Sequence, residues 1–349
     1  MEELAPKGLQ GVYVDKTEIA TTDSTGNLVY RGYRVVEIAD RLSFEEIAYL
    51  LVYSRLPNRE ETDEFRKFLI ENSKLPGYVV KIISAMKGMN IMDILRTSVS
   101  ALTVSGRDEK SLLSLAAKFP AIVNLAGDGP DPDKVPTGSF SERFYYFMTG
   151  RDDQKNAGLL EKILIMYMEH EFNASTFALR VTASTLADPA CAFTSALATL
   201  KGPLHGGANS EVLKFLLGLK SQDEVRRYVD DTLAKKEKLM GFGHRVYKDR
   251  DPRAQYIKGL LLRYFSDREV VRNAVFMEEY VWEKKNLAAN VDFYGALYMY
   301  LLGIDEKYYL PVFACSRVFG WVAHYIEQQS NNKLIRPLAL YTGKKDQKI

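Results

Sequence analysis

Residues 43–51 read SFEEIAYLL, and this stretch decides the fold class of the chain. A serine followed three residues later by a glutamate forms a capping box, in which each side chain bonds the backbone N–H of the other residue. Ile47, Leu50 and Leu51 then recur at the spacing that places apolar side chains on one helix face, and the pattern lasts until Pro57. The stretch therefore predicts a helix that starts at about residue 43.

Further helical patterns follow this one almost end to end, with glycine and proline between them. Two more capping-box starts are predicted, at Ser139–Glu142 and Ser266–Glu269. The predicted helices cover about 60–72, 76–87, 92–104, 108–119, 139–149, 155–169, 174–187, 190–201, 209–219, 222–238, 252–265, 269–287, 292–302 and 311–328.

Residues 10–36 have a different pattern from the rest of the chain. They contain GVYV at 11–14 and NLVY at 27–30, with a turn-like STGN at 24–27, which predicts two or three short strands. No repeated strand–helix–strand unit is present. We therefore expect an all-α protein with a small β element near its N-terminus.

Composition excludes several broad classes of protein. The chain has 349 residues, enough for a large core and about two domains. Its apolar fraction of 46% argues against a disordered or fibrous protein, and its net charge of +2 argues against nonspecific nucleic-acid binding. The N-terminus lacks the pattern of a signal peptide, and no apolar run reaches the ~18 residues of a membrane span. A cytoplasmic protein is expected.

The two cysteines, Cys191 and Cys315, both lie in apolar, helix-like runs. We expect both to be buried as free thiols in a reducing compartment, with a disulfide between them as the alternative.

Two glycine-flanked histidines are the main candidates for chemistry. The chain has four histidines, and two of them lie in GPLHGGAN at 202–209 and GFGHR at 241–245. A third segment, NVDFY at 290–294, supplies the carboxylate of Asp292 at an expected helix start. Two imidazoles and one acid suggest proton transfer at carbon or oxygen.

Several familiar sites are excluded by the sequence. There is no P-loop and no Gly-x-Ser-x-Gly nucleophile elbow, and Gly241-Phe242-Gly243 lacks the third glycine of a dinucleotide fingerprint. His170-Glu171 begins a zinc motif, but Ala174 stands where the second histidine would be. No metal site is predicted.

Arginines supply candidate anion-binding groups. Arg245 and Arg253, with Lys248 between them, form either a solvated charged turn or a clamp for carboxylates or phosphates. Arg317 lies in an apolar helical run, so it needs an anionic partner, which is either a structural carboxylate or a substrate. Arg336 precedes Pro337 and is expected in an extended segment.

His324 lies seven residues after Arg317 and shares its helix face. We expect a buried, hydrogen-bonded histidine at this position.

Six of these segments together resemble the citrate synthase family, in the order that the family shows. They are 168–173 (MEHEFN), 202–209, 241–253, 290–292, 316–317 and 336–337. The resemblance spans nearly the whole chain and is closest to short bacterial and archaeal members. It implies a homodimer of helical subunits, each with two domains that close over the substrate. The expected large domain comprises 1–206 and 304–349, and the small domain 207–303.

The resemblance also implies the reaction, in which acetyl-CoA and oxaloacetate give citrate and CoA without a metal or other cofactor. It makes Asp292 the base, His205 the group that stabilises the enol oxygen, and His244 the acid at the oxaloacetate oxygen. Other positions are implied to bind the substrates. Those for oxaloacetate are His170, Arg253, Arg317 and Arg336, and Arg336 is implied to reach into the partner subunit's site. Those for CoA are Gly241, Phe242, Gly243, Arg245 and Lys248.

Two alternatives stay open at this point. The first is a 2-methylcitrate synthase that uses propionyl-CoA, because one methylene in an apolar pocket is worth only ~1–3 kcal/mol. The second is a non-catalytic helical dimer of the same fold.

Overall fold

The structure is a computed structural model of the chain. It describes residues 4–131, 134–135, 138–206, 208–243, 247, 249–344 and 347, with the backbone alone at 208–210. The candidate residues His244, Arg245 and Lys248 lie outside the described residues, so their roles stay predictions.

A small antiparallel sheet forms near the N-terminus, as predicted. Its strands are β1 (Ala20–Thr22), β2 (Leu28–Tyr30) and β3 (Tyr33–Arg34), in the order β1-β2-β3, with Ala20 opposite Tyr30. The turn between β1 and β2 is held by the Asp23 carboxylate, which accepts hydrogen bonds from the backbone N–H groups of Thr25 and Asn27. The segment 11–14 is exposed coil and forms no strand.

The other regular elements of the described residues are helices, which confirms the predicted all-α class. The elements of the first half are η1 (Lys7–Leu9), α1 (Val35–Ile38), α2 (Phe44–Tyr53), α3 (Arg59–Asn72), α4 (Gly77–Ala85), α5 (Ile91–Ser100), α6 (Glu109–Ala116), α7 (Phe119–Ala126), α8 (Phe140–Thr149) and α9 (Gln154–Tyr167). Those of the second half are α10 (Ala174–Ser184), α11 (Pro189–Leu200), α12 (Ala208–Gly218), α13 (Gln222–Ala234), α14 (Pro252–Phe265), α15 (Glu269–Lys285), α16 (Val291–Leu301), η3 (Glu306–Tyr308) and α17 (Tyr309–Ser330).

Two of the three predicted capping boxes are present. Ser43 and Ser139 both accept from the backbone N–H three residues on, while Glu46 and Glu142 bond back to them. The third prediction, at Ser266, is wrong. Ser266 keeps helical backbone angles and ends α14, and α15 begins after Arg268 without a side-chain cap.

The helix α7 was not predicted, because Phe119-Pro120 reads as a helix breaker. The proline instead occupies the first turn of α7, where its missing N–H leaves no helical hydrogen bond unmade.

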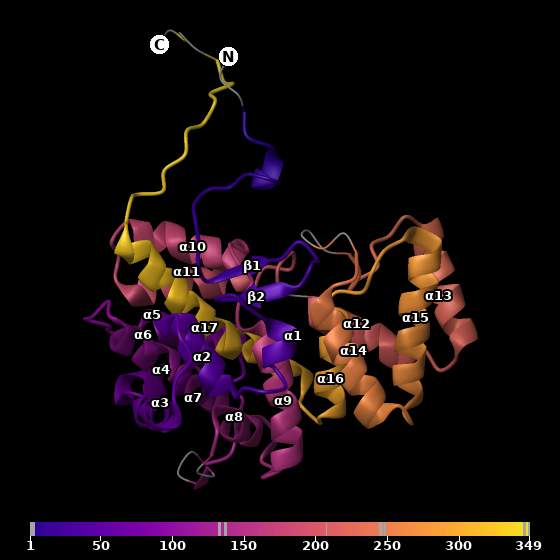
Figure 1. Cartoon of the computed structure of the whole chain (residues 1–349), viewed down its shortest axis with the longest axis horizontal. Helices are drawn as coiled ribbons and strands as arrows, with labels where there is room; N and C mark the ends of the chain where they lie inside the picture. Colours follow the sequence, from indigo (N-terminus) through magenta and orange to yellow (C-terminus); the bar gives the residue numbers. More distant parts are fainter. Residues whose placement is uncertain are drawn as a thin grey trace.

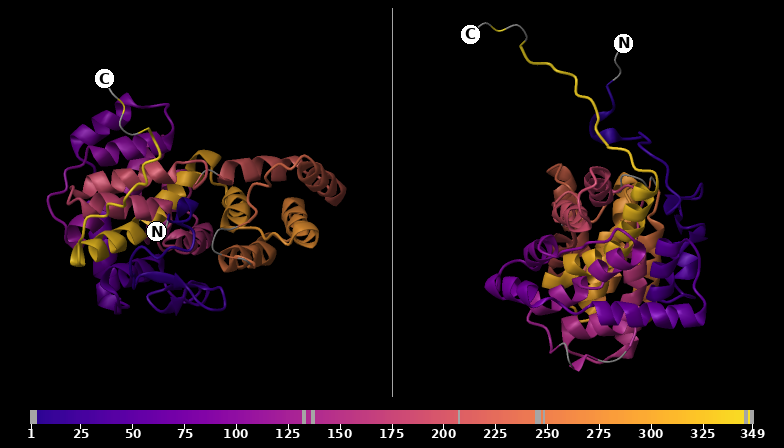
Figure 2. Two further views of the ribbon diagram at one scale, coloured as in Figure 1. Left: turned by 90° about the horizontal axis from the view of Figure 1, so that it is seen from above. Right: turned by 90° about the vertical axis from the view of Figure 1, so that its left-hand side faces the viewer.

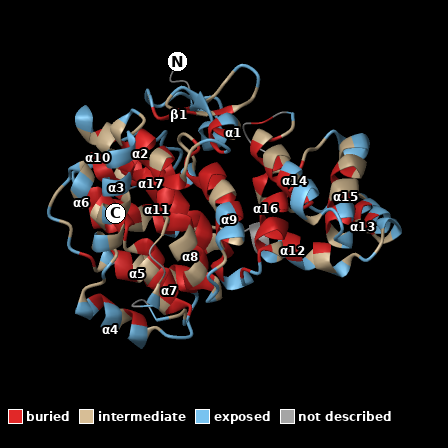
Figure 3. Cartoon of the chain, turned by 60° about the horizontal axis from the view of Figure 1, so that its bottom comes forward, coloured by how far each residue is buried: buried red, intermediate tan, exposed pale blue. Residues whose placement is uncertain are grey.

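The longest helix, α17, runs through the centre of the main helical body. It packs against helices that include α2, α6, α9 and α10, and nearly all of its residues from Tyr309 to Tyr325 are buried (Figure 3). This one helix therefore contacts elements from many parts of the sequence, and it can bring residues of those elements close together.

Helices α12 to α16 form a second group beside the main body, coloured orange in Figure 1. Within it α16 packs against α12 and α14, and α13 packs against α15. The group also contacts the main body, through α12 against α17 and α14 against α1.

Both ends of the chain project from the same side of the molecule (Figures 1 and 2). Residues 331–344 carry no regular secondary structure and are mostly exposed, as are residues 4–16. Exposed apolar side chains occur in both segments, among them Tyr13, Leu338 and Tyr341.

The cysteine prediction is half correct. Cys315 is buried and both thiols are free, so the disulfide alternative is wrong. Cys191 is exposed, because it lies in the first turn of α11, where its Sγ is 3.1 Å from Oδ2 of the capping residue Asp188.

Among the described residues, no helix combines the length and the apolar character that crossing a bilayer requires.

Candidate active site

His205 lies in the loop that connects α11 to α12. Its backbone N–H donates to Gly202 O at 2.9 Å, which closes a tight turn and holds the ring next to the start of α10. The ring is partly buried.

The hydrogen bond from the Ser175 backbone fixes the proton of the His205 ring. The backbone N–H of Ser175 donates to His205 Nε2 at 3.3 Å, while the Ser175 hydroxyl, 2.8 Å from the same nitrogen, donates to Asn173 Oδ1. A backbone N–H can only donate, so Nε2 is the acceptor and the ring proton of the neutral imidazole lies on Nδ1. His205 is therefore set up as an N–H donor through Nδ1.

The surroundings of His205 keep this ring neutral. Burial, and next the positive charge of Arg317, lower the pKa of His205 to about 4. A neutral imidazole donates a hydrogen bond to a developing oxyanion without carrying a charge into the site.

Asp292 lies in the first turn of α16, as predicted. The capping residue Asn290 accepts from the backbone N–H of Asp292 at 3.1 Å. Asn290 also joins this helix start to the second glycine segment, since its own N–H donates to Gly241 O at 2.9 Å and its Nδ2 donates to Gly243 O at 3.1 Å. The helix N-terminus favours an ionised carboxylate at this position.

Gly241 is required by both backbone conformation and space. Its φ is +81°, and a Cβ there would lie 2.8 Å from Val212 Cγ2 and 3.0 Å from Phe293 Cβ. We expect Gly241→Ala to destabilise the fold by about 2–4 kcal/mol. Gly259, within α14, is the matched control, because a Cβ added there would meet nothing within 4 Å. Gly259→Ala should therefore be neutral or stabilising. Chemical denaturation of both variants tests this, and equal midpoints would contradict it.

Arg317 is buried on α17, with 1% of its surface exposed. Its Nε donates to Tyr167 O at 2.7 Å and its guanidinium lies 4.7 Å from the ring centre of Phe313. Within the described part of the chain, no carboxylate forms an ion pair with it. The structural carboxylate that the sequence left open is thus not found among the described residues, and an anionic ligand stays a prediction.

Arg253 is the second buried arginine of the site. It lies in the first turn of α14 and makes a two-point ion pair with Asp251, at 3.1 Å from Nε to Oδ1 and 2.8 Å from Nη2 to Oδ2. Burial and then the positive charge of Arg253 act together to lower the pKa of Arg317, while Glu169 and Asp292 oppose them. Arg253 is therefore already paired with a buried carboxylate, whereas Arg317 is a buried guanidinium without an ion pair among the described residues.

His170 is buried in the turn between α9 and α10. Its Nε2 lies 3.1 Å from the hydroxyl of Tyr247, and the two rings meet edge to face. Tyr247 also faces the guanidinium of Arg253, at 5.5 Å from the ring centre. This contact brings the turn of His170 and the loop that precedes α14 together.

The described candidates converge on one region. The charge of Arg317 acts on His205, and the charge of Asp292 acts on Arg317. Both Asp292 and Arg253 act on the buried Tyr167, whose pKa burial raises well above its usual range. Charges shift a pKa in this way only at short range, so these groups from α9, the loop before α12, α14, α16 and α17 lie in one region of the molecule.

Two predicted positions are not among these charge contacts. The side chain of Phe242 is buried against Phe293, and its backbone N–H donates to Leu239 O at 3.3 Å. Arg336 is exposed, in the extended C-terminal segment.

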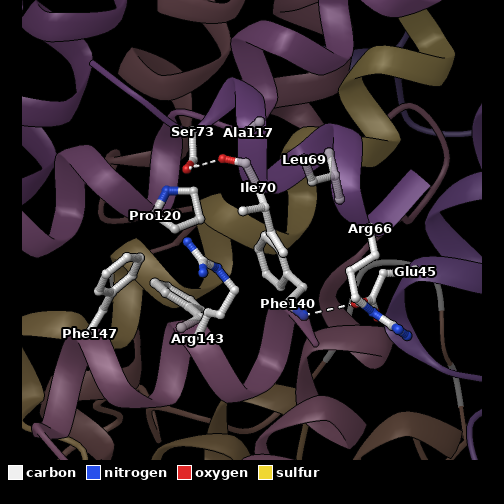
Figure 4. A pocket seen from close by; sticks show the side chains of 11 residues that line it. Glu45, Arg66, Leu69, Ile70, Ser73, Ala117, Pro120, Phe140, Arg143 and Phe147 are labelled. Carbon is white, nitrogen blue, oxygen red and sulfur yellow. Dashed lines mark hydrogen bonds and ion pairs between the residues drawn. The ribbon is translucent and has the colours of Figure 1, made fainter. Parts of the chain in front are cut away.

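A small cavity of about 30 Å³ lies elsewhere, in the main body between α2, α3 and α8 (Figure 4). Glu45, Arg66 and Phe140 line it, and no candidate site residue does. Its volume fits about one water molecule, so it is no substrate site. Among the described residues, no cluster of histidine, cysteine and carboxylate groups has the arrangement of a metal site.

Comparison with known proteins decides the family. The family model described as "Citrate synthase, C-terminal domain" matches residues 8–338. The chain belongs to the citrate synthase family.

Relatives of similar identity carry two different names. Citrate synthase 2 of Bacillus subtilis is 36% identical, over 99% of this chain and 98% of its own length. The 2-methylcitrate synthase of Shewanella oneidensis is also 36% identical, over 100% of this chain and 97% of its own. Overall identity therefore does not distinguish the two activities.

A solved structure matches the fold closely. It is the ternary complex of Thermoplasma acidophilum citrate synthase with carboxymethyl coenzyme A and oxaloacetate, with a TM-score of 0.90 and 31% identity over 100% of this chain and 98% of the other. The citrate synthase fold and family predicted from the sequence are confirmed, and the chain is an acyl-transferring enzyme. This sets aside the alternative of a non-catalytic helical dimer.

Sequence reasoning missed several residues that hold the site. Ser175, Tyr247 and Asn290 position His205, His170 and Asp292 respectively. Asn290 lies in the segment 290–294 and Tyr247 in the segment 241–253. The signal in the sequence was therefore a capping residue, and an aromatic residue, inside the segments that carry the candidates.

Proposed function

We propose that this enzyme condenses oxaloacetate with acetyl-CoA and hydrolyses the product to citrate and CoA. The observation that carries the proposal is the pair of buried arginines, Arg253 and Arg317, beside a neutral His205 and the carboxylate of Asp292. Such a site suits a small dianion next to a carbon acid.

The first step is proton removal from the acyl thioester. The Asp292 carboxylate takes a proton from the α-carbon, and the electron pair moves toward the thioester oxygen. Nδ1–H of His205 donates to that oxygen, which stabilises the enol without a metal ion. The hydrogen bond from the Ser175 backbone supports this role because it holds the required tautomer.

The second step forms the carbon–carbon bond. The enol carbon attacks the ketone carbon of oxaloacetate, and the ketone oxygen takes a proton from His244. His170, Arg253 and Arg317 bind the carboxylates of oxaloacetate. Water then hydrolyses the thioester, which releases CoA as the thiol. In this proposal CoA lies against Gly241, Phe242 and Gly243, and Arg245 and Lys248 also bind it.

A second candidate is the condensation of propionyl-CoA to 2-methylcitrate. The relative of that name from Shewanella oneidensis supports it, since it is as similar to this chain as the Bacillus subtilis citrate synthase. The two reactions share every step above and differ in the acyl pocket alone.

The test is oxaloacetate-dependent release of the CoA thiol, measured with a thiol reagent for acetyl-CoA and propionyl-CoA. We expect release with at least one of them only when oxaloacetate is present, and the higher kcat/KM identifies the acyl group. We also expect activity to survive dialysis against a chelator, because the proposed chemistry needs no cofactor. Absence of thiol release with both thioesters would reject the proposal.

We further propose that the enzyme is a cytoplasmic homodimer whose residues 207–303 form a small domain that closes over substrate. The exposed apolar side chains of both terminal segments, such as the 87% exposed Leu338, support a second copy as their cover. Arg336, in the same segment, would then reach the partner's site. The two free thiols suit a reducing compartment.

A further inference from the structure

One face of α17 lies against the turn that carries His170. Arg317, Gly320 and His324 share this face, at helical spacings of three and four residues. Gly320 is needed for the close approach, since a Cβ there would lie 2.3 Å from Glu169 Oε2 and 2.5 Å from Met168 O. The helix and the turn therefore meet without any side chain of residue 320 between them.

His324 is buried and hydrogen-bonded, as predicted, and it makes a close contact across this face. It is 0% exposed, and its Nε2 lies 2.9 Å from Glu169 Oε1. Its Nδ1 lies 3.3 Å from Nη1 of Arg180, which can only donate, so Nδ1 accepts and Nε2–H donates to Glu169. Both ring nitrogens are used, and both face groups outside the substrate cluster.

Glu169 is the residue immediately before His170, and it is also 0% exposed. Within the described residues His324 is the one hydrogen-bond donor to its carboxylate, whose other oxygen has no partner. The backbone of Glu169 is held as well, because the hydroxyl of Tyr30 lies 2.9 Å from both Glu169 N and Glu169 O. The residue before His170 is thus pinned through its side chain and its backbone.

Arg180 holds the other end of the same turn. Its guanidinium lies 4.4 Å from the ring centre of Phe172, which also meets the His324 ring edge to face. Arg180 is fixed in turn by Glu327 on α17, at 2.7 Å, and by Asp15 of the N-terminal segment, at 3.0 Å. His324 therefore bonds Glu169 and Arg180 contacts Phe172, so a residue on each side of His170 is held in place.

We propose that His324 is a positioning residue for oxaloacetate binding, acting through Glu169 to hold His170 at a fixed place relative to Arg317. The inference rests on the proposed function, because it takes His170 and Arg317 as ligands of oxaloacetate. Its physical basis is that one face of α17 carries both Arg317 and His324. His324 bonds Glu169, the residue before His170, so the position of the His170 turn is fixed relative to Arg317. The contacts of His324 itself are with Glu169, Arg180 and Phe172, and none of these is proposed to bind acyl-CoA or to act as the base.

The test compares His324→Leu with His324→Gln. Leucine leaves the buried Glu169 carboxylate without a donor, so we expect the KM for oxaloacetate to rise about tenfold or more. The KM for acyl-CoA should stay within about twofold, because binding of that substrate uses other residues. Glutamine can donate to Glu169 and accept from Arg180, so His324→Gln should recover most of the loss.

Tyr325→Phe is the matched control, since it removes a hydroxyl from the next residue of α17, which bonds Ala187 O at 3.5 Å on another face. An unchanged KM for oxaloacetate in His324→Leu, or no recovery in His324→Gln, overturns the proposal. If His324→Leu does not fold, Phe172→Leu decides, because Phe172 is only partly buried. An unchanged KM there also overturns it.

The same assays separate this inference from the function on which it rests. A wild-type enzyme without oxaloacetate-dependent thiol release rejects the proposed function. An active wild type whose His324 variants keep the normal KM rejects the positioning role alone.

Discussion

Asp292→Asn is expected to lower kcat by about 10²–10⁴-fold while the protein stays folded. The amide has the shape of the carboxylate but cannot take a proton from the acyl α-carbon. The start of α16 should be unaffected, because Asn290 provides the cap through the backbone N–H of residue 292. Thiol release at saturating substrates measures the loss, and the thermal unfolding midpoint checks the fold.

Asp188→Asn is the control for this variant. Asp188 caps α11 through its side chain, and asparagine is an equally good cap, so the same chemical change is made at a helix start outside the proposed machinery. We expect its kcat to stay within about twofold of the wild type. If Asp292→Asn keeps a tenth or more of the wild-type kcat, Asp292 is not the base.

The helices were predictable because their signals are local. Apolar spacing and caps such as Ser43 and Ser139 act within one or two turns of chain, and the structure follows them. The failures are also local in origin. Ser266 has the letters of a capping box, but α14 continues through Phe265 and uses Ser266 as its own end. Pro120 reads as a breaker and instead starts α7.

The candidate residues of the site could be predicted from the sequence motifs. The contacts that hold these residues in place could not. Spacing alone does not say that the loop of His205 meets the start of α10, where Ser175 fixes its tautomer. The same holds for Tyr30, a strand residue whose hydroxyl reaches Glu169 from a distant part of the chain. Such contacts depend on how helices pack around α17, and no short-range pattern in the sequence encodes that packing.

His205→Ala is expected to lower kcat by about 10²–10³-fold, the usual effect of removing one donor to a developing oxyanion. The KM for oxaloacetate should change little, because His205 is proposed to contact the thioester oxygen. Ser175→Ala is an informative companion variant, since the backbone N–H of Ser175 still donates to Nε2 and keeps part of the orientation. We expect it to lose less activity than His205→Ala, and equal losses would point to a structural effect.

The lowered pKa of His205 gives the same variant a second, independent signature. The folded protein holds this pKa at about 4, compared with 6.5 for the ordinary group. Between these values the unfolded chain binds a proton that the folded one refuses, so His205 makes the wild type less stable as pH falls from 6.5 toward 4. His205→Ala lacks this proton uptake. When the pH is lowered from about 7.5 to about 4.5, the thermal unfolding midpoint of the wild type should therefore fall by more than that of the variant. Parallel midpoints over that range would mean that the ring is not held neutral by its surroundings, and the donor role assigned to Nδ1–H would lose its basis.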